Sequence, residues 1–146
     1  MARATILHIE DDSDDVVLFE HACRKAGVKS DIQVVTDGQE ALAYLQEAAG
    51  FENRDDYPIP TLIVLDIKLP RMSGFDVLAW MRKEKQLRRL PVIVLTSSDH
   101  SADIKRAYDL GANSYLVKPV DLDDLVTLAR GIEEYWLSLN QGPILT

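Results

Sequence analysis

Side chains that could bind a metal ion and a phosphoryl group occur where four short apolar segments of this chain end. They are three carboxylates, two hydroxyls and one ammonium: Glu10 and Asp11, Asp66, Thr96 and Ser97, and Lys118. Neighbouring carboxylates repel one another and are best held together by a hard cation such as Mg²⁺, which prefers oxygen ligands. A hydroxyl and an ammonium beside them would suit a doubly charged phosphoryl group. No histidine or cysteine ends these segments, so zinc and thiol chemistry are not expected there.

Asp66 is the unusual member of this set, because it ends TLIVLD (61–66), the most apolar run of the chain. Burying a carboxylate costs free energy unless something compensates its charge. An ionised aspartate can attack phosphorus and form an acyl phosphate, and such a transfer depends mainly on positioning and charge neutralisation. We therefore expect Asp66 to be phosphorylated, with a cation and the ammonium of Lys118 compensating its charge.

Five apolar, β-branched segments alternate with amphipathic ones, which predicts an α/β fold with a parallel sheet and right-handed crossovers. The predicted strands cover residues 5–10, 32–35, 61–66, 91–96 and 114–117. The predicted helices cover about 13–26, 38–48, 75–83, 102–110 and 121–140, the last with Asp121 as its N-cap. Ligands of such sheets bind at the carboxyl ends of the strands, so the side chains listed above are expected to converge on one small cleft.

Size, charge and cysteine content narrow the class of protein. The 146 residues favour one domain, 1–146. A net charge of −8 argues against nucleic acid as a partner, and no apolar run approaches the roughly 20 residues of a membrane helix. With Cys23 as the single cysteine, an internal disulfide is excluded and a cytoplasmic location is expected. The polar segment 46–60 is either functional or mobile.

Four motifs, in this order, resemble response-regulator receiver domains of two-component signalling. They are ILHIEDD (6–12), IVLDIKLPRMSGFDVL (63–78), PVIVLTSSD (91–99) and YLVKP (115–119), and the resemblance covers nearly the whole chain. It implies a flavodoxin-like (βα)5 doubly wound sheet with strand order 2-1-3-4-5. It also implies Mg²⁺ or Mn²⁺ as cofactor and a sensor histidine kinase whose phosphohistidine donates the phosphoryl group.

The resemblance implies a metal site and a phosphoacceptor. Glu10, Asp11 and Asp66 would hold the metal, with Glu10 binding directly or through water, together with the backbone carbonyl of Lys68. Asp66 would accept the phosphoryl group. Glu10 departs from the aspartate that is common in the family but keeps its charge.

The same resemblance assigns the residues that respond to phosphorylation. Thr96, Ser97 and Lys118 would bind the phosphoryl group, although alanine is usual in the family where Ser97 stands. Thr96 and Tyr115 would form the conformational switch. The Lys118–Pro119 peptide bond is expected to be cis, an isomer found almost wholly at X-Pro bonds.

The chain also resembles a narrower group, the small stand-alone regulators associated with bacterial phytochrome kinases, in its segment 46–60 and its tail GIEEYWLSLN (131–140). Tyr135, Trp136 and Leu139 lie where the last helix should outrun the sheet, and exposed apolar side chains often mark an interface. We expect a homodimer through the fourth and fifth helices. The alternative is a tail that folds back on its own domain. The protein would pass its signal on by contact with an unidentified downstream protein.

Other interpretations remain open at this point. A haloacid-dehalogenase-like phosphatase also uses an aspartyl phosphate, but it needs a general-acid aspartate where Lys68 stands. A non-phosphorylated pseudo-receiver would not be expected to keep the whole set of site residues. We expect no enzymatic activity beyond self-catalysed phosphotransfer and dephosphorylation. Asp14 and Asp15 are interpreted as ordinary helix-start charges, and His8 as a packed core residue.

Overall fold

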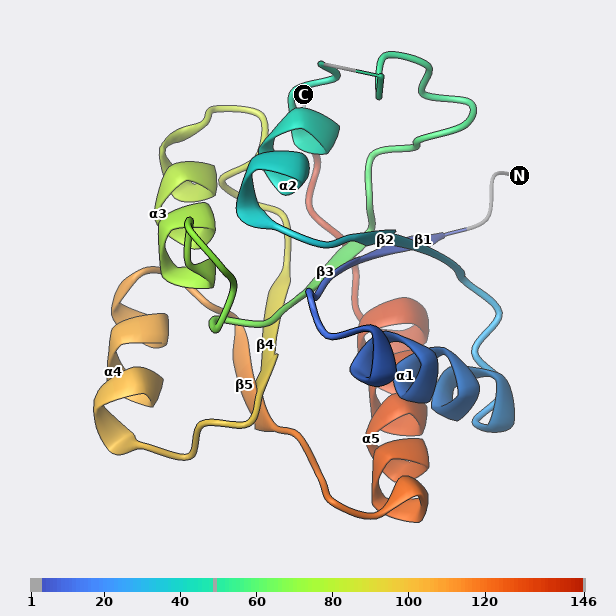
Figure 1. The fold of residues 1–146 in the computed structure, drawn as a ribbon. Helices are drawn as coiled ribbons and strands as arrows, with labels where there is room; N and C mark the ends of the chain where they lie inside the picture. The colour runs from blue at the N-terminus through green and yellow to red at the C-terminus, as the bar shows by residue number, and fades with distance from the viewer. Residues whose placement is uncertain (1–3, 49, 146) are drawn as a thin grey trace.

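The computed structural model describes residues 4–48 and 50–145, and its framework is one five-stranded parallel sheet (Figure 1). The strands are β1 Thr5–Ile9, β2 Asp31–Val35, β3 Leu62–Leu65, β4 Val92–Thr96 and β5 Ser114–Val117. Their order is β2-β1-β3-β4-β5, with Ile9 opposite both Val35 and Leu65, and Thr96 opposite Val117. The predicted flavodoxin-like strand order is confirmed.

Helices cover both faces of the sheet, as they must when the strands are apolar on both sides. They are α1 Ser13–Lys25, α2 Gly38–Leu45, α3 Gly74–Lys83, α4 Ser101–Asp109 and α5 Leu122–Glu134, followed by a π-helical turn, Tyr135–Leu139. Figure 1 shows α1 and α5 on one face and α2, α3 and α4 on the other. Alternate strand residues divide between the two resulting cores: in β1, Ile6 packs on the α1/α5 side and Leu7 on the other.

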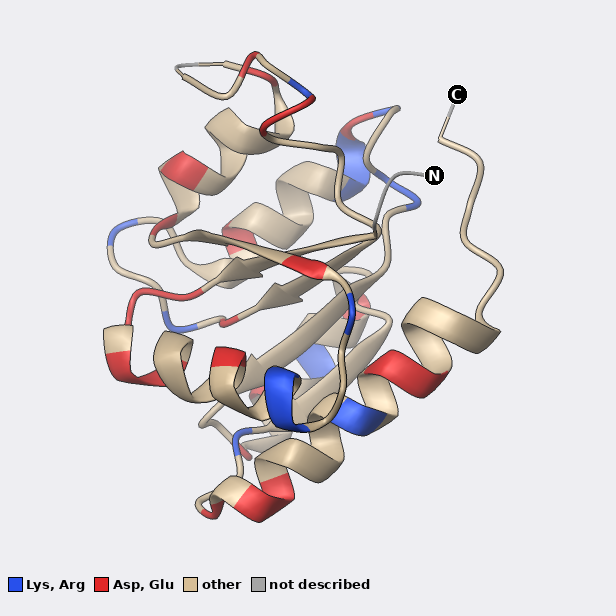
Figure 2. Ribbon diagram, turned by 90° about the vertical axis from the view of Figure 1, so that its right-hand side faces the viewer, with Lys and Arg blue, Asp and Glu red and all other residues tan. Residues whose placement is uncertain are grey.

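Local capping explains where two of the helices begin. The Asp12 side chain accepts hydrogen bonds from the backbone N–H groups of Asp14 and Asp15 at the start of α1. This helix has acidic residues in its first turn and basic residues in its last (Figure 2), which complements its dipole. Ser73 forms a capping box with Asp76 at the start of α3. Asp121 occupies the predicted N-cap position of α5, but its side chain makes no capping hydrogen bond.

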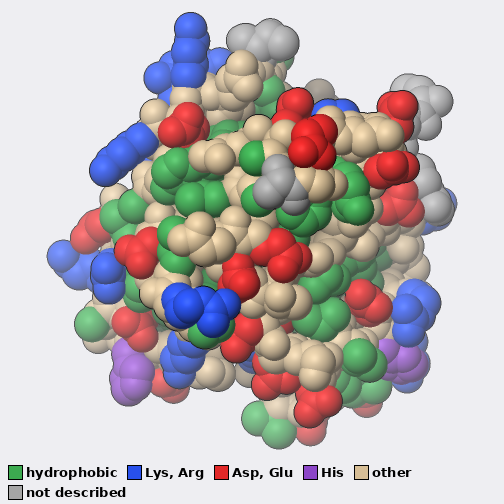
Figure 3. Space-filling model, turned by 45° about the horizontal axis from the view of Figure 1, so that its top comes forward, with side chains coloured by type: hydrophobic (Ala, Val, Ile, Leu, Met, Phe, Trp, Pro, Cys, Tyr) green, Lys and Arg blue, Asp and Glu red, His purple; other side chains and the backbone are tan. Residues whose placement is uncertain are grey.

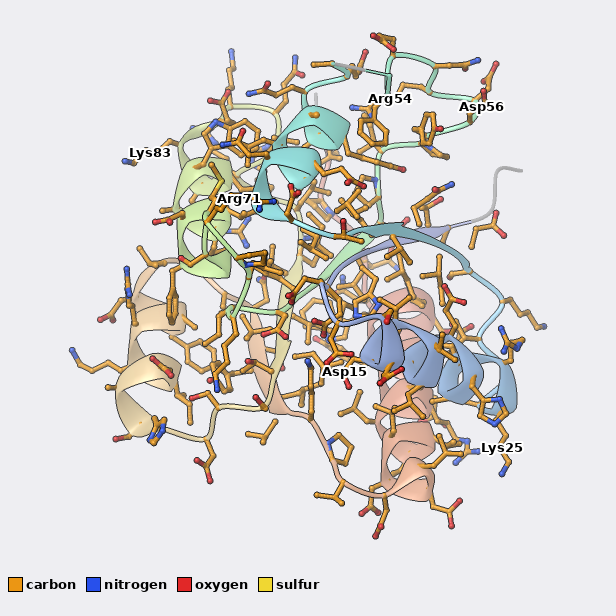
Figure 4. The ribbon with its side chains drawn as sticks, viewed as in Figure 1. Asp15, Lys25, Arg54, Asp56, Arg71 and Lys83 are labelled. Atoms are coloured by element: carbon orange, nitrogen blue, oxygen red, sulfur yellow. The ribbon has the colours of Figure 1, made fainter. Side chains whose placement is uncertain are left out.

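The second predicted helix ends early, at Leu45. The described part of the following segment 46–60 is held against α2 by hydrogen bonds. Arg54 donates to the backbone carbonyls of Tyr44 and Leu45 in α2 and of Tyr57 in the segment itself, at 3.0–3.2 Å (Figure 4). The Tyr44 hydroxyl donates to the carbonyl of Pro58 at 2.8 Å. The segment therefore packs against the end of α2 through specific contacts.

The predicted long C-terminal helix changes character at Tyr135, where α5 gives way to the π-helical turn. Trp136 packs against the core on the α1/α5 side, whereas Tyr135 is 51% exposed and Leu139 is 73% exposed. The tail then returns along the molecule: Leu145 packs against the core on the α2/α3 side, and Arg89 donates to the Ile144 carbonyl at 3.3 Å. These last residues follow the alternative in which the tail folds back.

The surface carries both signs of charge. On the face viewed in Figure 3, acidic and basic side chains are interspersed, with hydrophobic side chains between them. Over residues 4–48 and 50–145, no helix has both the length and the apolar character needed to cross a membrane.

Candidate functional site

The candidate site lies at the edge of the sheet where the carboxyl ends of β1, β3, β4 and β5 meet. Because these strands are adjacent and parallel, the residues that end them are brought together. Backbone hydrogen bonds continue the ladder by one residue on three of them. Glu10 N–H donates to the Val35 carbonyl, Asp66 N–H to the Ile9 carbonyl, and Lys118 N–H to the Thr96 carbonyl, at 2.8–3.0 Å. The sheet itself therefore fixes where these three side chains begin.

Asp66 is buried, with only 4% of its surface exposed, and both of its carboxylate oxygens accept hydrogen bonds. Oδ1 accepts from the Thr96 hydroxyl at 2.8 Å and from the Lys68 backbone N–H at 2.9 Å, and Oδ2 accepts from Lys118 Nζ at 2.8 Å. Burial acts to raise the pKa of Asp66, but the hydrogen bonds from Lys118, Lys68 and Thr96 outweigh it and hold the pKa below its usual value. Asp66 is therefore ionised at neutral pH.

Lys118 is the cation at the centre of the site. Its Nζ lies 2.6 Å from Glu10 Oε1, 2.7 Å from Asp15 Oδ2 and 2.8 Å from Asp66 Oδ2. Burial alone would lower the pKa of this ammonium, but its hydrogen bonds with Asp15, Asp66 and Glu10 raise it above the usual value. The interpretation of Asp15 as an ordinary helix-start charge is wrong, because its carboxylate contacts Lys118.

Glu10, Asp11 and Asp66 form a carboxylate cluster in which one oxygen from each lies within 4.8 Å of the others. Glu10 is 1% exposed, and burial, reinforced by the negative charge of Asp66 and opposed by Lys118, raises its pKa to about 7. Buried carboxylates that repel one another are what a divalent cation stabilises. The donor set consists of oxygens and therefore fits a divalent metal such as Mg²⁺ or Mn²⁺.

The other predicted phosphoryl and switch residues occupy different positions. Ser97 is exposed, and its hydroxyl lies 3.4 Å from Lys68 Nζ rather than at Asp66. Tyr115 is half-buried, and its hydroxyl donates to the Ser98 carbonyl at 2.9 Å. Ser98, which we did not assign to the site, is 2% exposed and donates to Asp103 of α4 at 2.6 Å. It thus connects Tyr115 with the first turn of α4.

Two expectations about neighbouring residues have opposite outcomes. The described residues contain no cis peptide bond, so the expected cis Lys118–Pro119 bond is trans. Trans is the lower-energy isomer of an X-Pro bond by about 0.5–1 kcal/mol. With this trans bond, the Lys118 ammonium still contacts the carboxylates of Glu10, Asp15 and Asp66. The expectation for His8 is confirmed: it is 2% exposed, and its ring centroid lies 4.6 Å from that of Phe19.

Gly74 determines how closely α3 can begin behind the site. A Cβ atom at Gly74 would collide with the backbone carbonyl of Asp66 and would lie 2.6 Å from the Cα of Ile67. The Gly74 N–H donates to the Ile67 carbonyl at 3.1 Å, which holds the two segments together. A residue without a side chain is therefore needed where α3 approaches the segment that carries Asp66.

Comparison with known proteins places this geometry in a family. The probable methanogenesis regulatory protein FilR2 of Methanothrix harundinacea is 36% identical over 94% of this chain and 86% of its own. The cyanobacterial phytochrome response regulator RcpA, in the crystal structure of its phosphorylated form, shares 37% sequence identity with this chain. The two structures align with a TM-score of 0.89 over 98% of this chain and 100% of RcpA. The response regulator Rcp1 from Synechocystis sp., in its Mn²⁺-bound crystal structure, shares 35% sequence identity with this chain. The two structures align with a TM-score of 0.85 over 97% of this chain and 99% of Rcp1.

The family model that matches is the response regulator receiver domain, over residues 6–130. This range contains all of β1 except Thr5, the other four strands in full, and every charged residue of the site described above. The chain therefore belongs to the response regulator receiver domain family.

Proposed function

We propose that this protein is a response regulator whose Asp66 accepts a phosphoryl group from the phosphohistidine of a sensor histidine kinase. The observation that carries the proposal is the environment of Asp66. It is buried and ionised, with the Thr96 hydroxyl on one oxygen, the Lys118 ammonium on the other, and Glu10 and Asp11 beside it. This arrangement leaves a reactive carboxylate next to groups that can receive a phosphoryl group.

In the proposed transfer, an oxygen of Asp66 forms a bond to phosphorus while the P–N bond of the phosphohistidine breaks. The electron pair of that bond stays on the histidine nitrogen of the kinase. Lys118 and Thr96 already contact the Asp66 oxygens, at 2.8 Å each, so they are placed to donate to phosphoryl oxygens attached there. Mg²⁺ or Mn²⁺, held by Glu10, Asp11 and Asp66 with the predicted Lys68 carbonyl, would neutralise negative charge during the transfer.

The signal would follow from the hydroxyl of Thr96 changing its partner from the Asp66 carboxylate to the phosphoryl group. Tyr115 lies opposite Val94 in β4, two residues before Thr96, and holds the Ser98 carbonyl through its hydroxyl. A shift of β4 at Thr96 would therefore alter the contact between Tyr115 and the segment that leads into α4. Phosphorylation would bias an equilibrium between two arrangements of this segment.

The proposed partners follow from the relatives and from the exposed tail. RcpA is a phytochrome response regulator, which supports a phytochrome-type kinase as the donor. The exposed side chains of Tyr135 and Leu139 support a homodimer interface at the end of α5, beside Trp136, which packs against the core. We further propose a cytoplasmic location and a downstream protein partner, with no role in binding nucleic acid.

Incubation with acetyl phosphate and Mg²⁺, followed by intact mass measurement, tests this function. The protein should gain one phosphoryl group. Asp66→Asn should gain none, and Asp14→Asn, which removes an exposed acid of α1, should behave as the wild type. Steady turnover of phosphate esters would instead identify a phosphatase, and an unmodified wild-type protein would identify a binding module. Phosphotransfer from a panel of histidine kinases should be fastest from a phytochrome-type kinase.

A further inference from the structure

We propose that Asp15 is a positioning residue that holds the Lys118 ammonium in place for phosphoryl transfer. No motif of the receiver family pointed to this residue. The inference rests on the proposed function of Asp66, which it extends to a side chain supplied by α1 rather than by a strand end. Asp15 lies at the first turn of α1, next to the carboxyl ends of the strands (Figure 4).

The Lys118 ammonium donates hydrogen bonds to Asp15 and Asp66 and forms an ion pair with Glu10. An ammonium has three N–H groups, and Nζ lies 2.6–2.8 Å from Glu10, Asp15 and Asp66. Lys118 is 17% exposed, so its donors have little access to water. Removing the Asp15 carboxylate would leave one N–H donor of a largely buried charge without its protein acceptor, and such a loss is costly.

Of the three carboxylates that contact Lys118, Asp15 alone lies outside the candidate metal and phosphoryl site. Glu10 and Asp66 belong to the carboxylate cluster that fits a divalent cation, and Asp66 is also the proposed phosphoacceptor. Asp15 is not a member of that cluster. If a cation were held by Glu10 and a phosphoryl group were attached to Asp66, Asp15 would be the carboxylate that remains available to Lys118.

The position of Asp15 is itself fixed by the start of α1. Its backbone N–H donates to Asp12 Oδ1 at 3.2 Å, in the cap that begins the helix. Its carboxylate is thereby held at the side of the site formed by α1, 2.7 Å from Nζ. A lysine side chain is long and can adopt many rotamers, so an acceptor fixed in this way restricts where the ammonium can lie.

Asp14 provides a matched control within the same helical turn. It has the same charge, and its backbone N–H also donates to Asp12 Oδ1, at 2.9 Å. In the described part of the chain it is not among the carboxylates that contact Lys118. Asp14→Asn and Asp15→Asn therefore change the charge of α1 equally, and only the second removes a contact with the ammonium.

The first measurement is hydrogen exchange of the Lys118 ammonium, followed by ¹H–¹⁵N NMR in the presence and absence of Mg²⁺. The wild type and Asp14→Asn should show a protected ammonium signal in both conditions. Asp15→Asn should exchange faster, with the larger increase in Mg²⁺, because Glu10 is then engaged by the cation. Equal exchange in the two variants would overturn the proposed contact.

The second measurement is the phosphorylation rate with acetyl phosphate at saturating Mg²⁺. Asp15→Asn should be slower by about threefold to tenfold, as expected for a misplaced charged group, and Asp14→Asn should match the wild type. Asp15→Glu should recover part of the rate, which a purely structural defect would not do. A rate for Asp15→Asn equal to or above that of Asp14→Asn would refute the positioning role. If the wild type were not phosphorylated, the proposed function would fail, whereas ammonium exchange would still decide whether Asp15 holds Lys118.

Discussion

Replacing Lys118 with methionine is expected to destabilise the protein without metal and to strengthen its binding of Mg²⁺. The ammonium contacts three carboxylates within 2.8 Å. Removing one partner of a buried ion pair typically costs about 3–5 kcal/mol. Solvent reduces that cost here because Asp15 is 34% exposed, and Glu10, with a pKa of about 7, can take up a proton. We therefore expect a loss of about 2–3 kcal/mol at pH 7.

Mg²⁺ should reduce this loss, because a divalent cation replaces the missing positive charge. The more negative site of Lys118→Met should bind Mg²⁺ about tenfold more tightly, which corresponds to about 1.4 kcal/mol. At saturating Mg²⁺ the difference in stability between variant and wild type should therefore shrink by a similar amount. Phosphorylation should nevertheless be lost or strongly slowed, because the donor to the phosphoryl oxygens is gone.

Urea unfolding at pH 7, with a chelator and then with Mg²⁺, measures both effects. Lys68→Met is the matched control, since Lys68 is exposed and its Nζ contacts Ser97 at 3.4 Å rather than a carboxylate of the site. It should unfold as the wild type does. The reasoning would be refuted if Lys118→Met were as stable as Lys68→Met in the chelator, or if its stability deficit did not change with Mg²⁺.

Three further predictions concern residues around the site and the core. Arg82→Ala should lower the free energy of unfolding by about 2–4 kcal/mol, because Arg82 donates to carbonyls of the two loops before β4 and β5; exposed Arg88→Ala, measured by the same urea unfolding, should change it little. Burial lowers the pKa of His8 from 6.5 to about 4, so its contribution to stability is complete above pH 6.5 and is lost as the pH falls to 4, by up to about 3 kcal/mol. His8→Asn should flatten that part of the stability curve, and an unchanged slope would contradict the assignment. Gly74→Ala should slow phosphorylation of Asp66 and lower thermal stability, because the added methyl group collides with the Asp66 backbone; wild-type values for both would be incompatible with the close approach of α3.

The strands and most site residues were predictable because their physical signals are local. The apolar run at 62–65 fits a strand that is buried on both faces, as in a parallel sheet, and a carboxylate directly after it needs compensation wherever the chain folds. Glu10, Asp66, Thr96 and Lys118 end their strands, so sheet order alone brings them together.

The residues that sequence reasoning missed are those whose type has a common alternative explanation. Asp15 resembles any acid in the first turn of a helix, and its contact is with Lys118, which lies 103 residues away in the sequence. Ser98 resembles any serine in a loop before a helix, but its hydroxyl donates to Asp103 and its carbonyl accepts from Tyr115. The isomer of the bond before Pro119 depends on tertiary contacts that no local pattern reports.

The position of a bound divalent cation tests the central claim most directly. Crystals grown with Mn²⁺ can be measured at a wavelength where manganese scatters anomalously, which locates the ion without assumption. The account predicts one strong peak at the carboxyl ends of β1 and β3, with oxygens of Asp11 and Asp66 in its coordination sphere, and Glu10 bound directly or through water. A manganese ion bound elsewhere, or an Asp66 carboxylate turned away from it, would contradict the account.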